Sequence, residues 1–234
     1  MSRSVLVTGG SRGIGHAIAE AFLAQGDKVA VASRSGGGPE GALALQCDVT
    51  DLEQVDAAFK QVEDSHGPVE VLVSNAGVVR DDLLIRMSPA DFNTVIDTNL
   101  TGPAFLAKRA LRGMVRAKRG RIVFISSAVS LRGEAGQANY AAAKAGLIGL
   151  ARSLAREYGS RGITVNVVSP GLTDTDMAET IDEAKRAEML RLIPLERMAA
   201  PQEIAAAVAF LGSPAASYIT GAILPVDGGS GMGH

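Results

Sequence analysis

The sequence predicts an α/β fold, in which a doubly wound parallel sheet of seven strands carries helices on both faces. Two observations lead to this prediction. Short apolar, β-branched runs alternate with stretches of helical periodicity. Most of the apolar runs are continuous, which is typical of strands that are buried on both faces. Strands that alternate with helices are joined by right-handed crossovers and therefore lie parallel.

The expected elements follow one another without a linker or an internal repeat, so residues 1–234 are predicted to form a single domain. Strands are expected at 5–8, 29–33, 43–47, 69–74, 122–126, 164–168 and 222–226. Helices are expected near 14–25, 51–65, 91–118, 137–159 and 201–211. A long segment near 170–198 has no regular pattern, and loops of that length usually serve function. We therefore expect a substrate lid at about 172–198.

The bulk composition excludes several classes of protein. A net charge of -2, from 23 basic and 25 acidic residues, argues against a general nucleic-acid binder. No apolar run reaches the length of a membrane span, and the chain opens without a basic-then-apolar leader, so a cytoplasmic protein is expected. Cys47 is the single cysteine and the three histidines are scattered, so we expect neither a disulfide nor a metal site.

The first predicted strand leads into a glycine-rich turn, Gly9-Gly10-Ser11-Arg12-Gly13-Ile14-Gly15, and a helix follows it. Glycines let the backbone approach a pyrophosphate, and a helix N-terminus offers free N–H groups to the phosphates. The spacing differs from the commoner Gly-x-Gly-x-x-Gly fingerprint. By itself the motif leaves open a turn that binds nothing. Within this pattern of strands it indicates a Rossmann-like dinucleotide site.

Tyr140 and Lys144 lie four residues apart on a predicted helix, so they share one helix face. A nearby ammonium group lowers the pKa of a phenol, and a tyrosine beside a cation is a general acid/base. Such pairs are common on amphipathic helices, and the pair gains weight from the glycine-rich turn. Polar or glycine residues also end most of the strands, where ligands bind in parallel sheets. They include Arg34, Asp48-Val49, Asn75-Ala76-Gly77, Ser126-Ser127 and Pro170-Gly171.

These motifs together resemble the short-chain dehydrogenase/reductase family, from Val5 to Gly229. The segments 80–87, 136–146 and 218–221 look more narrowly like 3-oxoacyl-[acyl-carrier-protein] reductases, and the two ends of the chain look like their mycolate-type branch. Long-chain members often carry a large apolar residue between the catalytic serine and tyrosine. Here Arg132 and Glu134 stand in that stretch, which argues against very long chains.

The resemblance implies a role for each matching residue. Tyr140 is the acid that protonates the carbonyl oxygen, and Lys144 lowers its pKa and binds the nicotinamide ribose. Ser127 orients the substrate carbonyl and is preferred over Ser126, while Asn99 holds a water that feeds protons to the lysine. The implied cofactor-binding residues are Gly9, Ser11, Arg12, Gly13, Ile14, Gly15, Arg34, Asp48, Val49, Asn75, Ala76, Gly77, Tyr140, Lys144, Pro170, Gly171, Thr173 and Thr175.

The cofactor is expected to be NADPH. NAD sites of this kind carry an acidic residue about 20 positions after the glycine turn, to bind the ribose hydroxyl. The second strand has no acidic residue there and ends instead at Arg34, while Arg12 lies within the turn. Guanidinium groups suit a 2'-phosphate, although both could also be solvated surface residues. NADPH in turn implies that the enzyme works as a reductase.

The implied partners are an acyl-carrier protein and three further copies of this chain, in a homotetramer. Carrier proteins are acidic, and a basic stretch is present at Lys108, Arg109, Arg112, Arg116, Lys118, Arg119 and Arg121, with Arg161 as an addition. Such a stretch can equally be a solvated helix face. Lys118 and Arg161 align with carrier-docking residues of the family. Two other functions stay open: reduction of another small carbonyl such as a sugar or steroid, and a catalytically silent nucleotide sensor.

Overall fold

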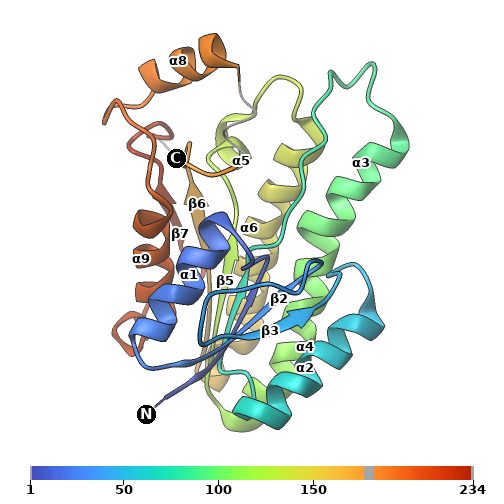
Figure 1. Ribbon diagram of the computed structural model, residues 1–234, viewed down its shortest axis with the longest axis vertical. Helices are drawn as coiled ribbons and strands as arrows, with labels where there is room; N and C mark the ends of the chain where they lie inside the picture. Colours follow the sequence, from blue (N-terminus) through green and yellow to red (C-terminus); the bar gives the residue numbers. More distant parts are fainter. Residues whose placement is uncertain (1, 177–181, 233–234) are drawn as a thin grey trace.

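Seven parallel strands form one sheet in the order β3-β2-β1-β4-β5-β6-β7 (Figure 1). The structure is a computed structural model, and it describes residues 2–176 and 182–232. The strands are β1 Ser4–Thr8, β2 Lys28–Ser33, β3 Leu43–Gln46, β4 Val71–Ser74, β5 Gly120–Ile125, β6 Ile163–Pro170 and β7 Ile223–Val226. The strand order reverses between β1 and β4, and ligands of such sheets bind at that reversal. The predicted fold class is confirmed.

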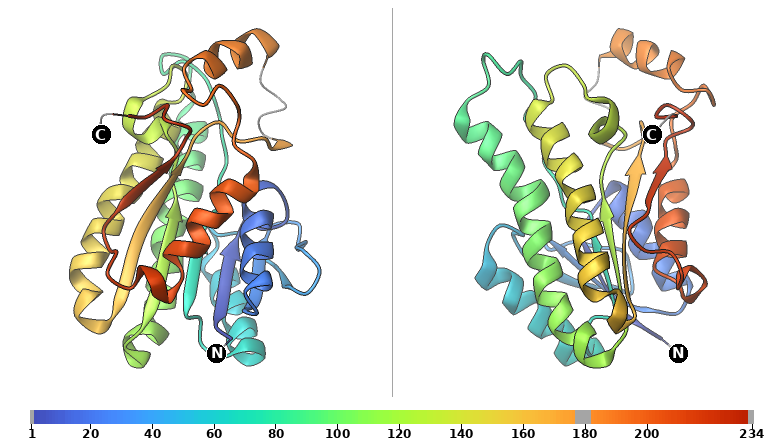
Figure 2. Two further views of the ribbon diagram at one scale, coloured as in Figure 1. Left: turned by 90° about the vertical axis from the view of Figure 1, so that its left-hand side faces the viewer. Right: turned by 180° about the vertical axis from the view of Figure 1, so that it is seen from behind.

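Helices cover both faces of the sheet (Figure 2). One face packs against α1 and α9, and the other packs against α2, α4 and α6. The helices are α1 Gly13–Ala24, α2 Leu52–His66, α3 Pro89–Ile96, α4 Gly102–Ala117, α5 Val129–Arg132, α6 Ala138–Tyr158, α8 Glu183–Arg191 and α9 Pro201–Leu211. A π-helical turn η1, Asp97–Thr101, joins α3 to α4, and short 3-10 turns lie at η2 Gly159–Arg161 and η3 Pro214–Ala216.

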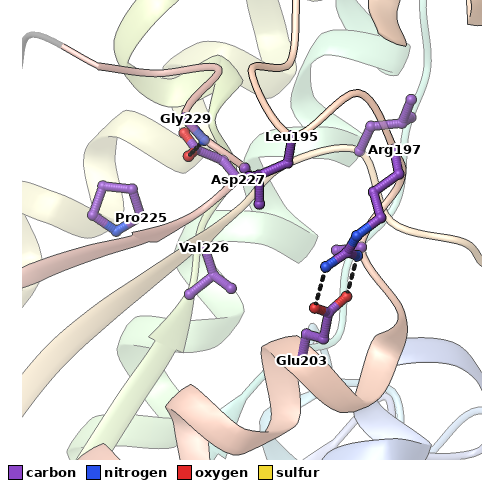
Figure 3. A pocket seen from close by; sticks show the side chains of 10 residues that line it. Leu195, Arg197, Glu203, Pro225, Val226, Asp227 and Gly229 are labelled. Atoms are coloured by element: carbon purple, nitrogen blue, oxygen red, sulfur yellow. Dashed lines mark hydrogen bonds and ion pairs between the residues drawn. The ribbon is translucent and has the colours of Figure 1, made fainter.

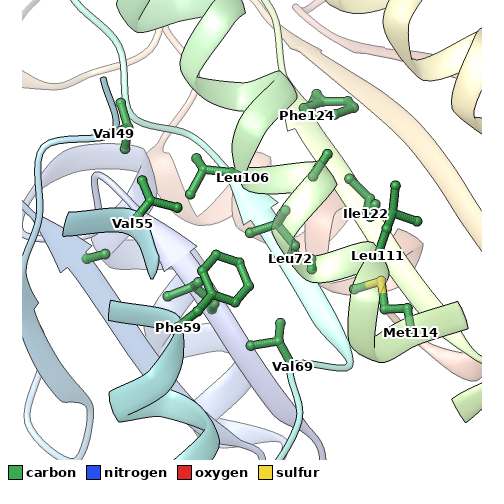
Figure 4. Packing of buried hydrophobic residues seen from close by; sticks show 14 of the residues in the cluster. Val49, Val55, Phe59, Val69, Leu72, Leu106, Leu111, Met114, Ile122 and Phe124 are labelled. Carbon is green, nitrogen blue, oxygen red and sulfur yellow. The ribbon is translucent and has the colours of Figure 1, made fainter. Parts of the chain in front are cut away.

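The core on the α2 and α4 side is built from side chains that interdigitate between strands and helices (Figure 4). Phe59 on α2, Leu72 on β4 and Phe124 on β5 are all fully buried. Burying one side chain of this size stabilises the fold by about 1.5–3 kcal/mol. Neighbouring residues of each strand point to opposite faces, so Leu6 joins this cluster while Val5 and Val7 join the one beneath α1 and α9. Apolar residues on both faces explain the continuous runs in the sequence.

The segment expected to be irregular contains a helix. β6 extends to Pro170, and α8 occupies Glu183–Arg191 within the predicted lid. Residues 177–181 of that lid lie outside the described residues. Figure 2 shows α8 and the loop before α3 at the same end of the molecule, beyond the carboxyl ends of the strands. The helix was missed because its sequence is strongly polar and lacks an apolar stripe.

The helix expected at 91–118 is also different, because the π turn η1 divides it. Pro103 has no backbone N–H, so it cannot donate to the carbonyl of Asn99 four residues earlier. The N–H of Gly102 donates instead to the carbonyl of Asp97, five residues earlier. Such single π turns are frequent at functional sites.

Within the described part of the chain, no helix combines the length and the apolar character that a membrane crossing requires.

Candidate active site

The glycine-rich turn lies between the end of β1 and the start of α1, and several of its glycines are packed too tightly for a side chain. A Cβ on Gly15 would lie 2.3 Å from the carbonyl oxygen of Gly9, which no real Cβ tolerates. Gly13 adopts a φ of 56°, in the left-handed region that favours glycine. The first N–H groups of α1 therefore remain open to a ligand. This cradle fits the pyrophosphate of a dinucleotide.

Asn75 braces this turn from the neighbouring strand. Its amide nitrogen donates to the carbonyl oxygens of Thr8 and Gly9, both at 3.1 Å. The backbone N–H groups of Asn75 and Ala76 donate to the Thr8 hydroxyl at 3.1 and 3.2 Å. Both amide protons of Asn75 are used within the protein, so this residue shapes the site through the backbone of β1. Thr8 was not among the predicted site residues, although it directly precedes the glycines.

The segment after β6 covers the glycine turn from the other side. Thr175 lies against Gly13, where an added Cβ would approach its methyl carbon to 3.3 Å. Asp176 forms an ion pair with Arg12 at 3.0 Å. The hydroxyl of Thr173 donates to the carbonyl of Gly171 at 3.0 Å and so holds the bend after Pro170. Of the predicted residues of this segment, Thr175 lies directly against the turn, whereas Gly171 packs against Asp227 after β7.

At the far end of the turn, the predicted contacts come from β2 and β3. Arg34 follows β2 and is exposed, with its carbonyl accepting a hydrogen bond from Gln46 at 3.1 Å. Asp48 follows β3, and one of its oxygens accepts from the N–H and the hydroxyl of Thr50, at 2.9 and 2.7 Å. Val49 is buried, and Ser11 faces Gly37 in the loop after β2. These residues line the same edge of the sheet as the glycine turn.

Tyr140 and Lys144 lie one turn apart near the start of α6, as their spacing predicts. Lys144 is 4% exposed, and its ammonium donates to the carbonyl of Ile125 at 2.8 Å. The same nitrogen lies 5.6 Å from the centroid of the Tyr140 ring. Burial lowers the pKa of Lys144 to about 8. The lysine is therefore poised to exchange a proton near neutral pH.

The pKa of Tyr140 is raised, to about 12, whereas the sequence argument expected Lys144 to lower it. Burial is the largest cause, a hydrogen bond with the Ser127 side chain acts in the opposite direction, and the charge of Asp81 raises the pKa further. The phenol is consequently protonated at neutral pH, which is the form that a general acid requires.

The structure separates the two serines after β5. The Ser126 hydroxyl is buried and donates to the carbonyl of Lys144 at 2.9 Å, so it fastens α6 to the sheet. The Ser127 side chain instead hydrogen-bonds Tyr140 and accepts from the N–H of Val129 at 3.3 Å. The geometry thus favours Ser127 over Ser126 as the residue beside the reacting carbonyl.

Asn99 is fully buried in the π turn η1. Its side chain accepts from the N–H of Val78 and donates to the carbonyl of Val78, both at 2.8 Å. A Cβ on Gly77 would lie 3.1 Å from the Asn99 oxygen and 3.6 Å from the Lys144 nitrogen. The loop after β4 thus brings Asn99 and Lys144 to the same point. Among the residues predicted as catalytic, all four share this end of the sheet.

A cavity of about 440 Å³ lies apart from this cluster, between the loop before α9 and the end of β7 (Figure 3). Arg197 and Glu203 lie together on one side of it, joined by two hydrogen bonds of 2.6 and 2.7 Å. That pairing lowers the pKa of Glu203 to about 2, and Glu203 also accepts from the N–H of Ala200 at 2.8 Å. Through its bond with the N–H of Ala200, Glu203 caps the start of α9. Tyr140, Ser127 and Lys144 do not line the cavity.

Comparison with known proteins agrees with this geometry. A family model described as Enoyl-(Acyl carrier protein) reductase matches residues 9–231. The 3-oxoacyl-[acyl-carrier-protein] reductase MabA of Mycobacterium avium is 53% identical over 234 residues, which cover 100% of this chain and 92% of the relative. MabA of Mycobacterium tuberculosis is 54% identical, with 100% and 95% covered. The reductase FabG of Vibrio harveyi is 47% identical over 235 residues, with 97% and 96% covered.

Proposed function

Because this chain belongs to the short-chain dehydrogenase/reductase family of oxidoreductases, which use a nicotinamide cofactor, we propose that it reduces 3-oxoacyl-[acyl-carrier-protein] to 3-hydroxyacyl-[acyl-carrier-protein] with NADPH. This step belongs to fatty-acid elongation. The observation that carries the proposal is the convergence of Ser127, Tyr140 and Lys144 at the same edge of the sheet as a turn whose glycines leave no room for side chains. A reductase of this class needs both parts at one edge of the sheet.

NADPH, when bound, would supply the hydride that adds to the carbonyl carbon. Tyr140 donates its proton to the carbonyl oxygen, on which negative charge develops. Ser127 donates to the same oxygen and fixes its position. Lys144, whose pKa burial lowers to about 8, exchanges protons near neutral pH and would also bind the nicotinamide ribose. Asn99 holds the loop after β4 against Lys144 and would order a water there.

The preference for NADPH is part of the proposal and rests mainly on Arg34. Arg34 is exposed at the end of β2, where NAD-dependent relatives place an acid. Within the described part of the chain, no carboxylate forms an ion pair with Arg34, whereas Arg12 already pairs with Asp176. Arg34 is therefore the cation with its charge fully available to a 2'-phosphate. The remaining predicted contacts stay as proposed cofactor ligands.

The carrier is proposed to dock on Lys118 and Arg161. The structure brings them together, because a Cβ on Gly162 would lie 2.7 Å from the carbonyl oxygen of Lys118. Several other cations of the basic stretch are neutralised: Arg109 pairs with Asp56 and Glu63, and Arg119 pairs with Glu70. Lys118 and Arg161 are exposed, and the described residues offer them no ion pair. Within the described residues Lys108, Arg116 and Arg121 form no ion pair either, so Lys118 and Arg161 are singled out by the resemblance and by their closeness to each other.

A carrier docked at Lys118 and Arg161 is far from Tyr140 of the same subunit. Tyr140 lies in the first turn of α6, and Arg161 follows the last turn of the same helix. The 18 residues from Tyr140 to Tyr158, at the end of the helix, span roughly 27 Å along its axis, and Arg161 lies beyond that end. The pantetheine arm of a carrier, at about 13 bonds, spans only roughly 15 Å when extended. We therefore propose that the carrier docked on one subunit delivers its acyl group to Tyr140 of a neighbouring subunit.

This proposal requires the expected homotetramer. The small residues of α6 divide into two kinds: Gly146 packs within the subunit, with Leu100 2.7 Å from an added Cβ, whereas Gly149 faces open space. An open face of small residues on α6 permits close approach of a second helix. Light scattering at micromolar concentration tests the assembly.

We further propose that the 234 residues form a single domain and that the protein acts in the cytoplasm. The proposed substrate lid, at about 172–198, includes α8.

The deciding experiment is an NADPH-consumption assay with acetoacetyl thioester beside unrelated ketones and sugars. Strong preference for the thioester supports the proposal, and equal rates would favour a reductase of other small carbonyls.

In the stretch before Tyr140, Arg132 and Glu134 form an ion pair at 3.4 Å. This charged stretch argues against a preference for very long acyl chains.

A further inference from the structure

The first turn of α6 carries Tyr140, and the backbone of this turn needs partners from outside the helix. The helix begins at Ala138, and the first N–H groups of an α-helix find no carbonyl acceptor within the helix itself. The N–H of Tyr140, the third residue of the helix, is one of these donors. Among the described residues, Gln137 at the N-cap position offers the helix no side-chain bond, and its amide donates instead to Asp81 at 2.9 Å.

Asn139 supplies the partner that the N–H of Tyr140 requires. The side-chain oxygen of Asn139 accepts from that N–H at 2.7 Å, and its side-chain nitrogen donates to the carbonyl of Arg80 at 3.0 Å. Arg80 and Asn139 lie 59 positions apart in the sequence, so only tertiary packing brings them together. Asn139 is fully buried, and an amide that is bonded at both ends keeps a single orientation. The backbone of Tyr140 is therefore tied to the loop between β4 and α3.

The same loop is held at a second point by Asn99. The side chain of Asn99, which is also fully buried, accepts from the N–H of Val78 and donates to the carbonyl of Val78, both at 2.8 Å. One residue separates Val78 from Arg80, so two buried asparagines, one from η1 and one from α6, bind the same short segment. The loop between β4 and α3 thus forms a common support for η1 and α6.

This common support fixes Tyr140 relative to the other residues of the site. Asn99 and Lys144 approach the loop at Gly77, where an added Cβ would lie 3.1 Å from the Asn99 oxygen and 3.6 Å from the Lys144 nitrogen. Three residues further along the loop, Asn139 binds the chain and holds the N–H of Tyr140. A continuous series of contacts therefore runs from Asn99 through the loop to the backbone of Tyr140.

We propose that Asn139 is a positioning residue, which holds Tyr140 in register with Lys144 and so sets the rate of proton donation to the substrate. The inference rests on the proposed role of Tyr140 as the acid. Because Asn139 is fully buried, it acts through the backbone of Tyr140 and does not touch the substrate. Proton donation requires the two heavy atoms to lie within hydrogen-bond reach, and a misplacement of about 1 Å can lower turnover by roughly 10²-fold.

The test is the variant Asn139→Ala, which removes the acceptor from the N–H of Tyr140 and the donor from the carbonyl of Arg80. With a small 3-oxoacyl thioester, turnover should fall by roughly 10-fold to 10²-fold, because the first turn of α6 can then shift. KM for the thioester and the affinity for NADPH should stay close to the parent values, since the buried Asn139 side chain contacts neither ligand. Both are measured well below the melting temperature of the variant, so that only folded enzyme is compared.

Two control variants separate positioning from a loss of stability. Gln137→Ala removes a second side-chain bond between the same two segments and spares the N–H of Tyr140. Ser126→Ala removes a buried hydrogen bond to the carbonyl of Lys144 in the same helix. Both should keep turnover near the parent value, even where Ser126→Ala melts as early as Asn139→Ala. A folded Asn139→Ala enzyme with parental turnover, or an equal loss of turnover in Gln137→Ala, would overturn the proposal.

The variant Asn139→Asp provides the rescue. Its carboxyl group keeps an acceptor for the N–H of Tyr140, and in the protonated form it also keeps a donor for the carbonyl of Arg80. Turnover relative to the parent enzyme at the same pH should therefore exceed that of Asn139→Ala and should rise as the pH falls. The ratio for Asn139→Ala should stay flat. If Asn139→Asp never exceeds Asn139→Ala, the proposal is wrong.

Hydrogen exchange of the parent enzyme tests the contact itself, even if the variants do not fold. The N–H of Tyr140 should exchange slowly because Asn139 binds it, and exchange as fast as that of an unbonded amide would contradict the proposal. Near-normal turnover of Tyr140→Phe would instead refute the proposed mechanism as a whole. An impaired Tyr140→Phe beside a folded and fully active Asn139→Ala removes only the positioning role.

Discussion

The guanidinium of Arg12 and the carboxylate of Asp176 form an ion pair at 3.0 Å, joining the glycine-rich turn to the segment after β6. The side chains are 76% and 60% exposed, so the pair contributes little to stability. Its importance concerns the cofactor. Arg12 shares its charge with Asp176, while Arg34 at the end of β2 keeps its own. The two arginines that the sequence proposes for one phosphate therefore differ in their availability.

The variant Arg34→Ala should weaken binding of NADPH much more than binding of NADH, because only NADPH carries the 2'-phosphate. One hydrogen bond to a charged group contributes about 1.5–3 kcal/mol, which corresponds to a loss of roughly 10-fold to 150-fold in affinity. Titration of both cofactors by fluorescence measures the difference. Arg12→Ala is the matched control and should have the smaller effect. Equal loss for NADPH and NADH in Arg34→Ala would remove Arg34 as the phosphate ligand.

The variant Tyr140→Phe keeps the ring and removes the proton that the reaction consumes. Turnover should fall by at least about 10²-fold, the usual scale for general acid/base groups. Cofactor affinity should stay within a small factor of the parent value. Tyr158→Phe is the matched control, because Tyr158 is the last residue of the helix that holds Tyr140 in its first turn. Near-normal turnover in Tyr140→Phe would show that another group donates the proton.

Replacing Ser127 should lower turnover, whereas replacing Ser126 should lower the stability of the fold. Ser127→Ala removes a donor to the reacting oxygen and should lower turnover by about 10²-fold to 10³-fold without changing the melting temperature. Ser126→Ala removes the side-chain donor from the carbonyl of Lys144, which keeps its helical N–H partner, and should cost about 0.5–1.5 kcal/mol of stability. Thermal unfolding and turnover are measured on both variants. A reversed pattern would assign the catalytic hydroxyl to Ser126.

Delivery between subunits is tested with hybrid tetramers of two differently tagged variants. One carries Tyr140→Phe, and the other carries Lys118→Glu with Arg161→Glu. Each alone should reduce carrier-linked substrate poorly, and only the first should also fail with a small thioester. In the hybrid, the intact patch of one subunit can serve the intact Tyr140 of the next, so carrier-linked turnover should return.

The matched control places all three substitutions in one chain and combines it with the parent chain. Delivery between subunits predicts that such hybrids lose carrier-linked turnover beyond the share of inactive chains, while delivery within a subunit predicts no extra loss. If the substitutions at Lys118 and Arg161 raise KM equally for both substrates, the patch is not a carrier site. Higher salt should raise KM for the carrier-linked substrate only, because exposed charges are screened over about 10 Å at 0.1 M.

The sequence by itself determined the fold class, because continuous apolar runs that alternate with helical periodicity are local patterns. It also determined the glycine turn and the pairing of Tyr140 with Lys144, since both depend on spacings of a few residues. The boundaries of most strands and helices agree with the predictions to within a few residues. The predictions were wrong where local pattern was weak, at the polar helix α8, and where Pro103 interrupted the hydrogen bonds of a long helix.

Only the tertiary structure decided which polar groups meet. The resemblance favours Ser127, but the sequence cannot show that Ser126 bonds the backbone of α6 while Ser127 bonds Tyr140, because both serines follow β5 and their partners lie on a helix that only packing brings beside them. It also cannot show that Arg12 pairs with Asp176, 164 positions later, or that Asn139 holds Arg80. Such contacts depend on how distant segments pack after the sheet has formed, and no local periodicity encodes them. The charges that act on Tyr140 are set in the same way, by the loops that the fold brings beside it.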